Sequence, residues 1–122
     1  MTIDRHGSKI HIGEASILVL ETESVARTSL SELFRDKGHR VHEAPDSTSA
    51  IVQINNDPGV KVIMLDVDMP SWRSVVTHAR DTLSAAVILG MSAQDSERVV
   101  LEAQQLGVHG FPNKRSISRT GY

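Results

Sequence analysis

Acidic, hydroxyl and ammonium side chains follow apolar segments at four separate places in this sequence. Glu21 follows the first such segment, Asp66 and Asp68 follow another, Ser92 follows the next, and Lys114 follows the last. A carboxylate can act as a nucleophile, further acidic oxygens can bind a divalent metal, and a hydroxyl and an ammonium can bind phosphoryl oxygens. The chemistry that these residues suit, if the fold brings them into one shallow pocket, is phosphoryl transfer to Asp66.

Each of these residues taken singly has a simpler interpretation. An Asp that follows a strand is usually a turn or capping residue, and a lone Ser or Lys carries even less information. Four separate strand ends that each present a compatible group are improbable unless the groups act together. The hypothesis of a shared site therefore depends on the elements that position the residues.

The apolar segments predict strands of a parallel sheet. Residues 16–20, 60–65 and 86–91 are nearly continuous in hydrophobic character, as strands buried on both faces are. Residues 39–44 predict a weaker strand, and residues 109–114 predict a fifth.

Segments with helical spacing of apolar residues separate these strands. Glycine or asparagine residues and a basic last turn mark where the predicted helices end. The predicted helices lie between Ala26 and Gly38, between Pro45 and Asn56, between Trp72 and Leu83, and from about Ser96 to Leu106. Strands that alternate with helices predict an α/β fold with a doubly wound, five-stranded parallel sheet and any site at the carboxyl ends of the strands.

Length and composition indicate one small globular domain and exclude several function classes. The 122 residues suffice for a single core, here predicted for residues 15–122 behind an extension of residues 1–14. A net charge of -2 without any basic run argues against direct binding to nucleic acid or to a membrane surface. Without cysteine, a signal-peptide pattern or a long apolar run, the chain is expected to be cytoplasmic.

Four sequence blocks resemble the signature blocks of bacterial response regulator receiver domains, which act in two-component phosphorelay signal transduction. The blocks comprise residues 17–23, 63–70, 91–93 and 107–114, and the resemblance covers roughly residues 15–115. It implies a flavodoxin-like fold and a signalling protein, not an enzyme.

The resemblance also implies a role for each site residue. Asp66 would accept a phosphoryl group from a histidine kinase or a phosphotransfer protein, and Ser92 and Lys114 would bind the phosphoryl oxygens. Phe111 would be the aromatic residue that changes rotamer together with the hydroxyl. The switched surface would then bind a downstream protein partner.

The implied magnesium site departs from the family pattern. The resemblance implies Glu21, Asp66 and the main-chain carbonyl of Asp68 as ligands, but Thr22 stands where the family usually has a second aspartate. A neutral hydroxyl is a weaker ligand than a carboxylate, so Mg²⁺ affinity should fall unless Glu21 or Glu23 reaches in. The loop after Asp66 also departs from the family, and a shortened or distorted third helix is expected.

The end of the chain departs from the pattern as well. Only eight residues follow Lys114, so the C-terminal helix of the family is expected to be missing or truncated. Three explanations stay open for the exposed face: a truncated chain, a homodimer, or the N-terminal extension, where residues 9–12 alternate like a short strand.

Two alternatives to the phosphorylated switch follow from the same residues. A phosphorylation-independent pseudo-receiver would keep the fold and bind partners without phosphate, and Thr22 is its main support. The sequence from Asp66 to Asp68 also resembles the nucleophile motif of haloacid-dehalogenase phosphatases, although that motif normally ends the first strand of a larger domain. Trp72 either anchors a partner from an exposed loop or lies buried at the edge of the pocket.

Overall fold

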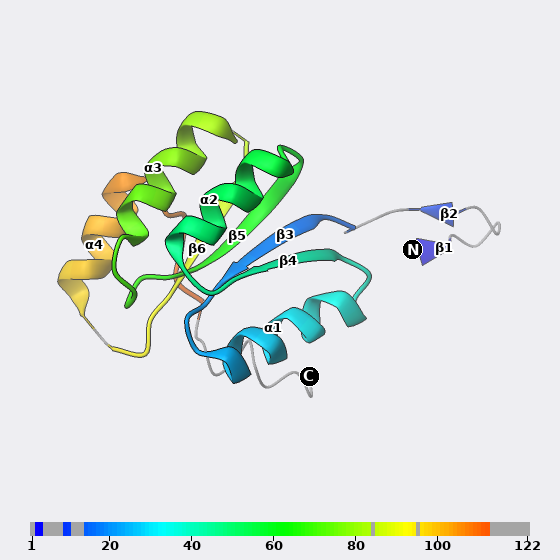
Figure 1. Cartoon of the computed structure of the whole chain (residues 1–122), viewed down its shortest axis with the longest axis horizontal. Coiled ribbons are helices and arrows are strands. Elements are labelled where there is room, and N and C mark those ends of the chain that lie inside the picture. The colour runs from blue at the N-terminus through cyan, green and yellow to red at the C-terminus, as the bar shows by residue number, and fades with distance from the viewer. Residues whose placement is uncertain (1, 4–8, 11–13, 84, 95, 113–122) are drawn as a thin grey trace.

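A four-stranded parallel sheet with helices on both faces forms the centre of the structure (Figure 1). This structure is a computed structural model, and it describes residues 2–3, 9–10, 14–83, 85–94 and 96–112. The sheet has the strand order β4-β3-β5-β6. Its elements along the chain are β3 (Ser16–Leu20), α1 (Ser24–Asp36), β4 (Arg40–Ala44), α2 (Ser47–Asn56), β5 (Val60–Asp66), α3 (Trp72–Thr82), β6 (Val87–Met91) and α4 (Glu97–Leu106). Two short strands, β1 (Thr2–Ile3) and β2 (Lys9–Ile10), pair antiparallel in a separate ladder.

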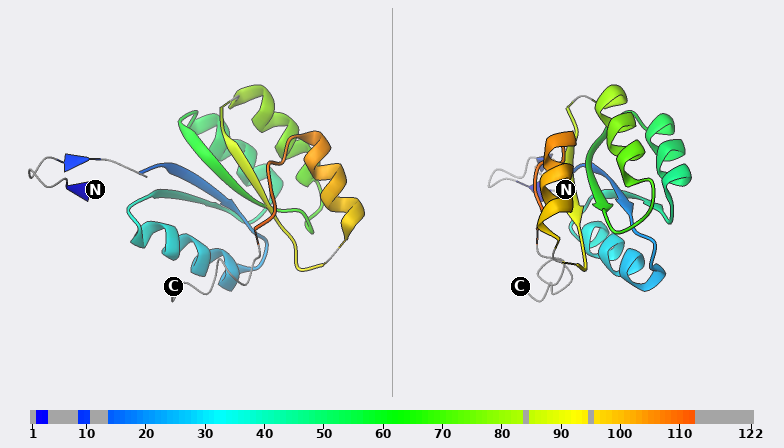
Figure 2. Two further views of the ribbon diagram at one scale, coloured as in Figure 1. Left: turned by 180° about the vertical axis from the view of Figure 1, so that it is seen from behind. Right: turned by 90° about the vertical axis from the view of Figure 1, so that its left-hand side faces the viewer.

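Alternation along the strands divides the apolar core into two layers. Successive side chains of a strand point to opposite faces of its sheet. Ile17 and Val19 of β3 therefore pack on the face of α1 with Leu30, whereas Leu18 and Leu20 pack on the face covered by α2, α3 and α4. Figure 2 shows α1 on one side of the sheet and the other three helices on the opposite side. Burial on both faces is the reason that these strands are continuously apolar.

The predicted fifth strand is wrong for the residues that the structure describes. The chain after α4 runs beside β6, but only one parallel bridge, between Leu89 and Gly110, joins them. The main-chain amide of Ile88 donates to Nδ1 of the His109 side chain at 3.0 Å, so a side chain takes the place of a ladder bond. Residues 113–122 lie outside the described residues, so the structure does not test the predicted end of this strand or the prediction that the C-terminal helix is missing or truncated. The other four strands and the four helices are confirmed close to their predicted bounds.

The unusual loop before α3 strains one residue and leaves the helix at 11 residues. Ser71 precedes the helix with φ 67°, and it is the only non-glycine residue with positive φ in the described part of the chain. A left-handed conformation costs a residue with a Cβ atom about 1–2 kcal/mol. The expected distortion therefore lies at Ser71. Trp72, the first residue of α3, is only 3% exposed and belongs to the core, so it is not an exposed partner anchor.

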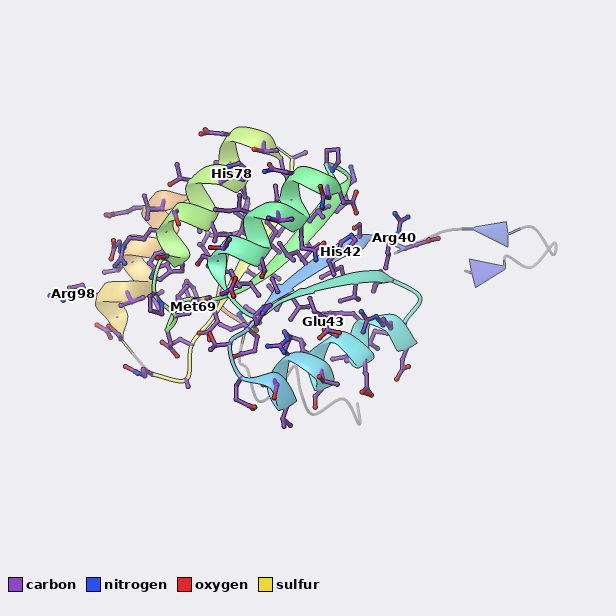
Figure 3. All side chains as sticks on the ribbon, in the orientation of Figure 1. Arg40, His42, Glu43, Met69, His78 and Arg98 are labelled. Carbon is purple, nitrogen blue, oxygen red and sulfur yellow. The ribbon has the colours of Figure 1, made fainter. Side chains whose placement is uncertain are left out.

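A polar cluster closes the opposite end of the sheet, where the strands begin. The carboxylate of Asp57 accepts hydrogen bonds from Ser16 Oγ at 2.6 Å and from the main-chain amide of Gly59 at 3.0 Å, and it lies 2.8 Å from Nε2 of His42. Figure 3 shows His42 on β4, beside this end of the sheet. The hydrogen bonds from Ser16 and His42 lower the pKa of Asp57 to about 2, because they stabilise the ionised carboxylate. The cluster joins β3, β4 and the turn before β5.

No helix in the described part of the chain is long and apolar enough to span a lipid bilayer.

Candidate functional site

Two buried carboxyl groups lie at the carboxyl edge of the sheet. Asp66 is the last residue of β5 and is 5% exposed, and Glu21 follows β3 and is 2% exposed. Leu20 of β3 is the register partner of Leu65 in β5, so the residues that follow them occupy neighbouring strand ends. The sequence prediction that Glu21 and Asp66 share one edge is thus confirmed by the strand register.

The turn after β5 is built on the Asp66 carboxylate. Oδ1 of Asp66 accepts a hydrogen bond from the main-chain amide of Asp68 at 2.8 Å. The amide of Val67 donates to the carbonyl of Met91 at 2.9 Å, which extends the pairing of β5 with β6 by one residue. These two bonds bring the Asp68 main chain beside the end of β6, where Ser92 follows Met91.

The Asp68 side chain crosses to the loop after β6 and binds it with both carboxylate oxygens. Oδ1 lies 2.8 Å from Ser92 Oγ, and Oδ2 accepts the main-chain amide of Ala93 at 2.7 Å. Ser92 Oγ also accepts the amide of Gln94 at 3.0 Å and lies 2.6 Å from its carbonyl oxygen. A hydroxyl has one hydrogen, and an ionised carboxylate is a stronger acceptor than a carbonyl. We therefore assign the hydrogen of Ser92 to Asp68.

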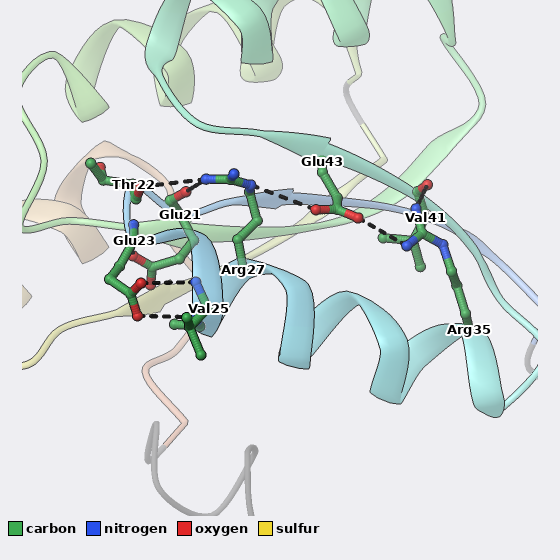
Figure 4. Close-up of polar contacts among 9 residues, drawn as sticks. Glu21, Thr22, Glu23, Val25, Arg27, Arg35, Val41 and Glu43 are labelled. Carbon is green, nitrogen blue, oxygen red and sulfur yellow. Dashed lines mark hydrogen bonds and ion pairs between the residues drawn. The ribbon is translucent and has the colours of Figure 1, made fainter.

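The loop between β3 and α1 holds its two acidic side chains, Glu21 and Glu23, in different ways (Figure 4). Glu23 does not reach toward Asp66: its carboxylate caps α1 by accepting the amides of Val25 at 2.8 Å and Ala26 at 3.1 Å. Oε2 of Glu21 accepts the amide of Glu23 at 3.0 Å, and the side chain of Thr22 is exposed. Glu21 is therefore the acidic residue that this loop contributes to the site.

Arg27 fixes this loop, and sequence reasoning missed it. Its Nη1 donates to the carbonyl oxygens of Glu21 at 2.9 Å and Thr22 at 3.3 Å. Its Nε lies 3.6 Å from Glu43 of β4, whose other oxygen pairs with Arg35 at 2.9 Å. Glu43, the partner of Arg27 on β4, is far from Arg27 in sequence. The only sequence signal for this role is that Arg27 lies in the first turns of the helix that follows the acidic loop.

Phe111 lies against β6 at a position without a side chain. A Cβ atom on Gly90 would lie 2.4 Å from Cε2 of the Phe111 ring and 2.6 Å from its Cζ. The ring is partly buried and packs on the core layer that α2, α3 and α4 cover. Phe111 therefore occupies an inward position that exists only because residue 90 is glycine.

The structure thus brings together Glu21, Asp66, Asp68 and Ser92, and Lys114 lies outside the described residues. In the described part of the chain, no group of three or more His, Cys, Asp or Glu side chains is arranged to hold a metal ion. The residue types at the Asp66 edge suit Mg²⁺ in kind, because carboxylates such as those of Glu21 and Asp66 and a main-chain oxygen such as that of Asp68 are ligands that this ion takes. This edge has two buried carboxyl groups, those of Glu21 and Asp66. Thr22 has no carboxylate, and the carboxylate of Glu23 caps α1.

The comparisons with known proteins decide the family of the chain. A family model for the response regulator receiver domain matches residues 17–119. The chain belongs to the response regulator receiver domain family. This family is a signalling module and not a typical enzyme family. No curated protein matches this receiver domain in sequence.

Solved structures similar to this receiver domain confirm the flavodoxin-like fold. The chemotaxis protein CheY4 of Vibrio cholerae has a TM-score of 0.75 at 24% identity, over 84% of this chain and 88% of that chain. An orphan response regulator of H. pylori has a TM-score of 0.75 at 18% identity, over 87% of this chain and 89% of that chain. NtrX of Brucella abortus, crystallised with ADP, has a TM-score of 0.75 at 22% identity over 83% of this chain, which spans only 23% of that longer protein.

Proposed function

We propose that this receiver domain accepts a phosphoryl group on Asp66 and thereby switches a surface that binds a downstream protein. The donor is a histidine kinase or a phosphotransfer protein of a two-component phosphorelay. The observation that carries the proposal is the position of Asp66: a buried carboxylate at the end of a central strand, beside a loop whose hydroxyl and amide already bind an anionic group.

The proposed reaction moves one phosphoryl group between two side chains. A carboxylate oxygen of Asp66 forms a bond to phosphorus while the bond from phosphorus to the imidazole nitrogen of the partner's phosphohistidine breaks. The electron pair of the broken bond stays on that nitrogen, which then takes up a proton from water. Asp66 is suited to this role because the amide of Asp68 donates to its Oδ1 at 2.8 Å and thereby orients the carboxylate at the end of β5.

We propose Glu21, Asp66 and the main-chain oxygen of Asp68 as ligands of Mg²⁺ at this edge. When bound, Mg²⁺ neutralises negative charge on the phosphoryl group during transfer. Because Thr22 is neutral and Glu23 is engaged as a helix cap, the site should need more Mg²⁺ than a site with three carboxylates. Arg27 acts as a positioning residue by holding the carbonyls of the loop that carries Glu21.

The switch in this proposal is a shift between two populations of the loop after β6 and of Phe111. Ser92 and Lys114 would bind the phosphoryl oxygens, and phosphorylation would favour the population in which Phe111 holds the inward position against Gly90. The switched surface then includes α4 and the segment beside β6, which Phe111 connects to the core.

The remaining proposals concern location and assembly. We propose that the relay operates in the cytoplasm and that the chain binds neither nucleic acid nor an anionic membrane directly, since its net charge is -2 and its sequence has no basic run. A homodimer stays a prediction.

The experiment that tests the proposal is the reaction of the purified protein with acetyl phosphate and Mg²⁺, followed by intact mass. We expect a mass gain of one phosphoryl group on the wild-type protein and no gain on Asp66→Asn. The variant is nearly isosteric, so circular dichroism should show it folded. Equal mass gains on both proteins would show that Asp66 is not the acceptor.

One observation favours a second candidate function, the phosphorylation-independent pseudo-receiver. The hydroxyl of Ser92 and the amide of Ala93 are both engaged by Asp68, and Thr22 brings no carboxylate to the site. Such a domain would bind its partner without phosphate. If the wild-type protein gains no mass with phosphodonor and Mg²⁺ both in large excess, that result would favour this candidate over the switch.

A further inference from the structure

The contact between Asp68 and the loop after β6 is a two-point anion contact. Both carboxylate oxygens of Asp68 are used, one by the Ser92 hydroxyl at 2.8 Å and one by the Ala93 amide at 2.7 Å. The partners lie 24 and 25 residues away in sequence, so tertiary structure and not a local turn creates the contact. Hydrogen bonds to an ionised acceptor are shorter and stronger than those between neutral groups.

The same contact lies next to the proposed phosphoacceptor. The amide of Asp68 donates to Asp66 Oδ1 at 2.8 Å, and Asp66 is the register partner of Met91, the residue before Ser92. The donors of Ser92 and Ala93 therefore border the Asp66 carboxylate on the β6 side. A phosphoryl group attached to Asp66 would bring negatively charged oxygens to donors that another anion already binds.

We propose that the Asp68 carboxylate is an internal stand-in for the phosphoryl group. It holds the loop of Ser92 and Ala93 in an anion-bound arrangement in the unphosphorylated protein, and it must leave those donors before Asp66 can be phosphorylated. The competition with phosphorylation rests on the proposed function of Asp66, whereas the arrangement of the loop does not.

Two consequences distinguish this role from that of an ordinary surface aspartate. Without its carboxylate, the loop loses its anion, and the environment of the Ala93 amide changes. The Ala93 amide becomes available, the Ser92 hydroxyl keeps only the Gln94 carbonyl at 2.6 Å as its acceptor, and one negative charge beside the incoming phosphoryl group disappears. Asp68 is an exposed residue, so we expect a moderate effect of about tenfold on the phosphorylation rate, which corresponds to about 1.4 kcal/mol.

The test compares Asp68→Ala and Asp68→Asn with wild type and with Asp81→Asn as a matched control. Asp81 is an exposed carboxylate near the end of α3, away from the loop after β6, so its replacement removes the same charge. The first measurement is the ¹H–¹⁵N NMR position of the Ala93 amide in the protein without phosphodonor. The second is the rate of mass gain with acetyl phosphate and Mg²⁺.

In Asp68→Ala we expect the Ala93 proton to move upfield, as an amide does when it loses a charge-assisted hydrogen bond, and phosphorylation to be about tenfold faster. Asp68→Asn should lie between Asp68→Ala and wild type, because its amide oxygen can serve only one of the two donors. Asp81→Asn should match wild type in both measurements. Phosphorylation of Asp68→Ala without phosphorylation of wild type would support the inference most strongly.

The failures of the two proposals give different patterns. If the NMR signal of the Ala93 amide does not move in Asp68→Ala, the proposal that the Asp68 carboxylate is the internal anion of this loop is overturned, whatever the phosphorylation rates are. If wild type and Asp68→Ala are phosphorylated at equal rates, the proposed competition between the Asp68 carboxylate and the phosphoryl group is overturned, but Asp66 remains the acceptor. If no variant gains mass, the proposed function of Asp66 fails and the competition fails with it.

Discussion

Substitution of Gly90 by alanine should expose how tightly Phe111 is bound against β6. The added Cβ atom would lie 2.4, 2.6 and 2.9 Å from three atoms of the Phe111 ring, and real Cβ contacts are essentially never this short. The ring must therefore leave its position or the strand must shift. Overpacking of this kind costs typically about 1–3 kcal/mol. We expect Gly90→Ala to lower the free energy of unfolding by about 2 kcal/mol.

The effect of Gly90→Ala on the free energy of unfolding should change sign once the Phe111 ring is removed. No positive φ is recorded for Gly90, so alanine can adopt its backbone conformation. In a Phe111→Ala background the Cβ atom meets no ring, and replacement of glycine by alanine then stabilises by about 0.4–1 kcal/mol through the unfolded state. The two substitutions should thus have a coupling energy of about 2–3 kcal/mol, within the range known for residues in contact.

The assay is urea unfolding of the four proteins in this double-mutant cycle. Trp72 is the only tryptophan and lies buried in the same core layer, so its fluorescence reports the unfolding of the region that Phe111 joins. Unchanged m-values would show that the comparison is of stability alone. Additive effects within about 0.5 kcal/mol would refute the contact between Phe111 and Gly90.

Three further predictions concern the strand ends and the loop before α3. Asp57→Asn should lower the free energy of unfolding by about 2 kcal/mol at neutral pH. The pKa of Asp57 is about 2 in the folded protein, below its value in the unfolded chain, so the stabilisation is complete above about pH 4 and is lost as the pH falls toward about 2. Urea titrations of both proteins at several pH values measure this loss. A difference in free energy of unfolding between wild type and Asp57→Asn that stays constant with pH would contradict the prediction. Ser71→Gly should raise stability by about 0.5–1 kcal/mol by relieving the left-handed backbone, measured by thermal unfolding; a loss would contradict the strain. Thr22→Asp should lower the Mg²⁺ concentration for half-maximal phosphorylation about tenfold, and an unchanged requirement would exclude residue 22 from the metal site.

Part of the site was predictable from the sequence because the residues that follow parallel strands lie at the same edge of the sheet. The apolar runs that end at Leu20, Leu65 and Met91 have few alternatives to parallel strands, and parallel strands end at one edge. Glu21 and Asp66 therefore had to lie at the same edge, and the adjacency of β3 and β5 in the sheet made them neighbours. The fifth strand was mispredicted because its pattern cannot show that the side chain of His109 would take the hydrogen bond of the Ile88 amide.

The sequence by itself determined the order of strands and helices, the two-sided burial of the sheet, and the edge at which Asp66 lies. These features follow from hydrophobic periodicity and helix end signals, which act over a few residues. Only the tertiary structure decided the partners of the side chains: Glu23 on the helix amides, Asp68 on the loop after β6, and Phe111 on Gly90. The physical reason is that a flexible carboxylate or ring has several partners within reach along the chain, and packing between distant segments selects one.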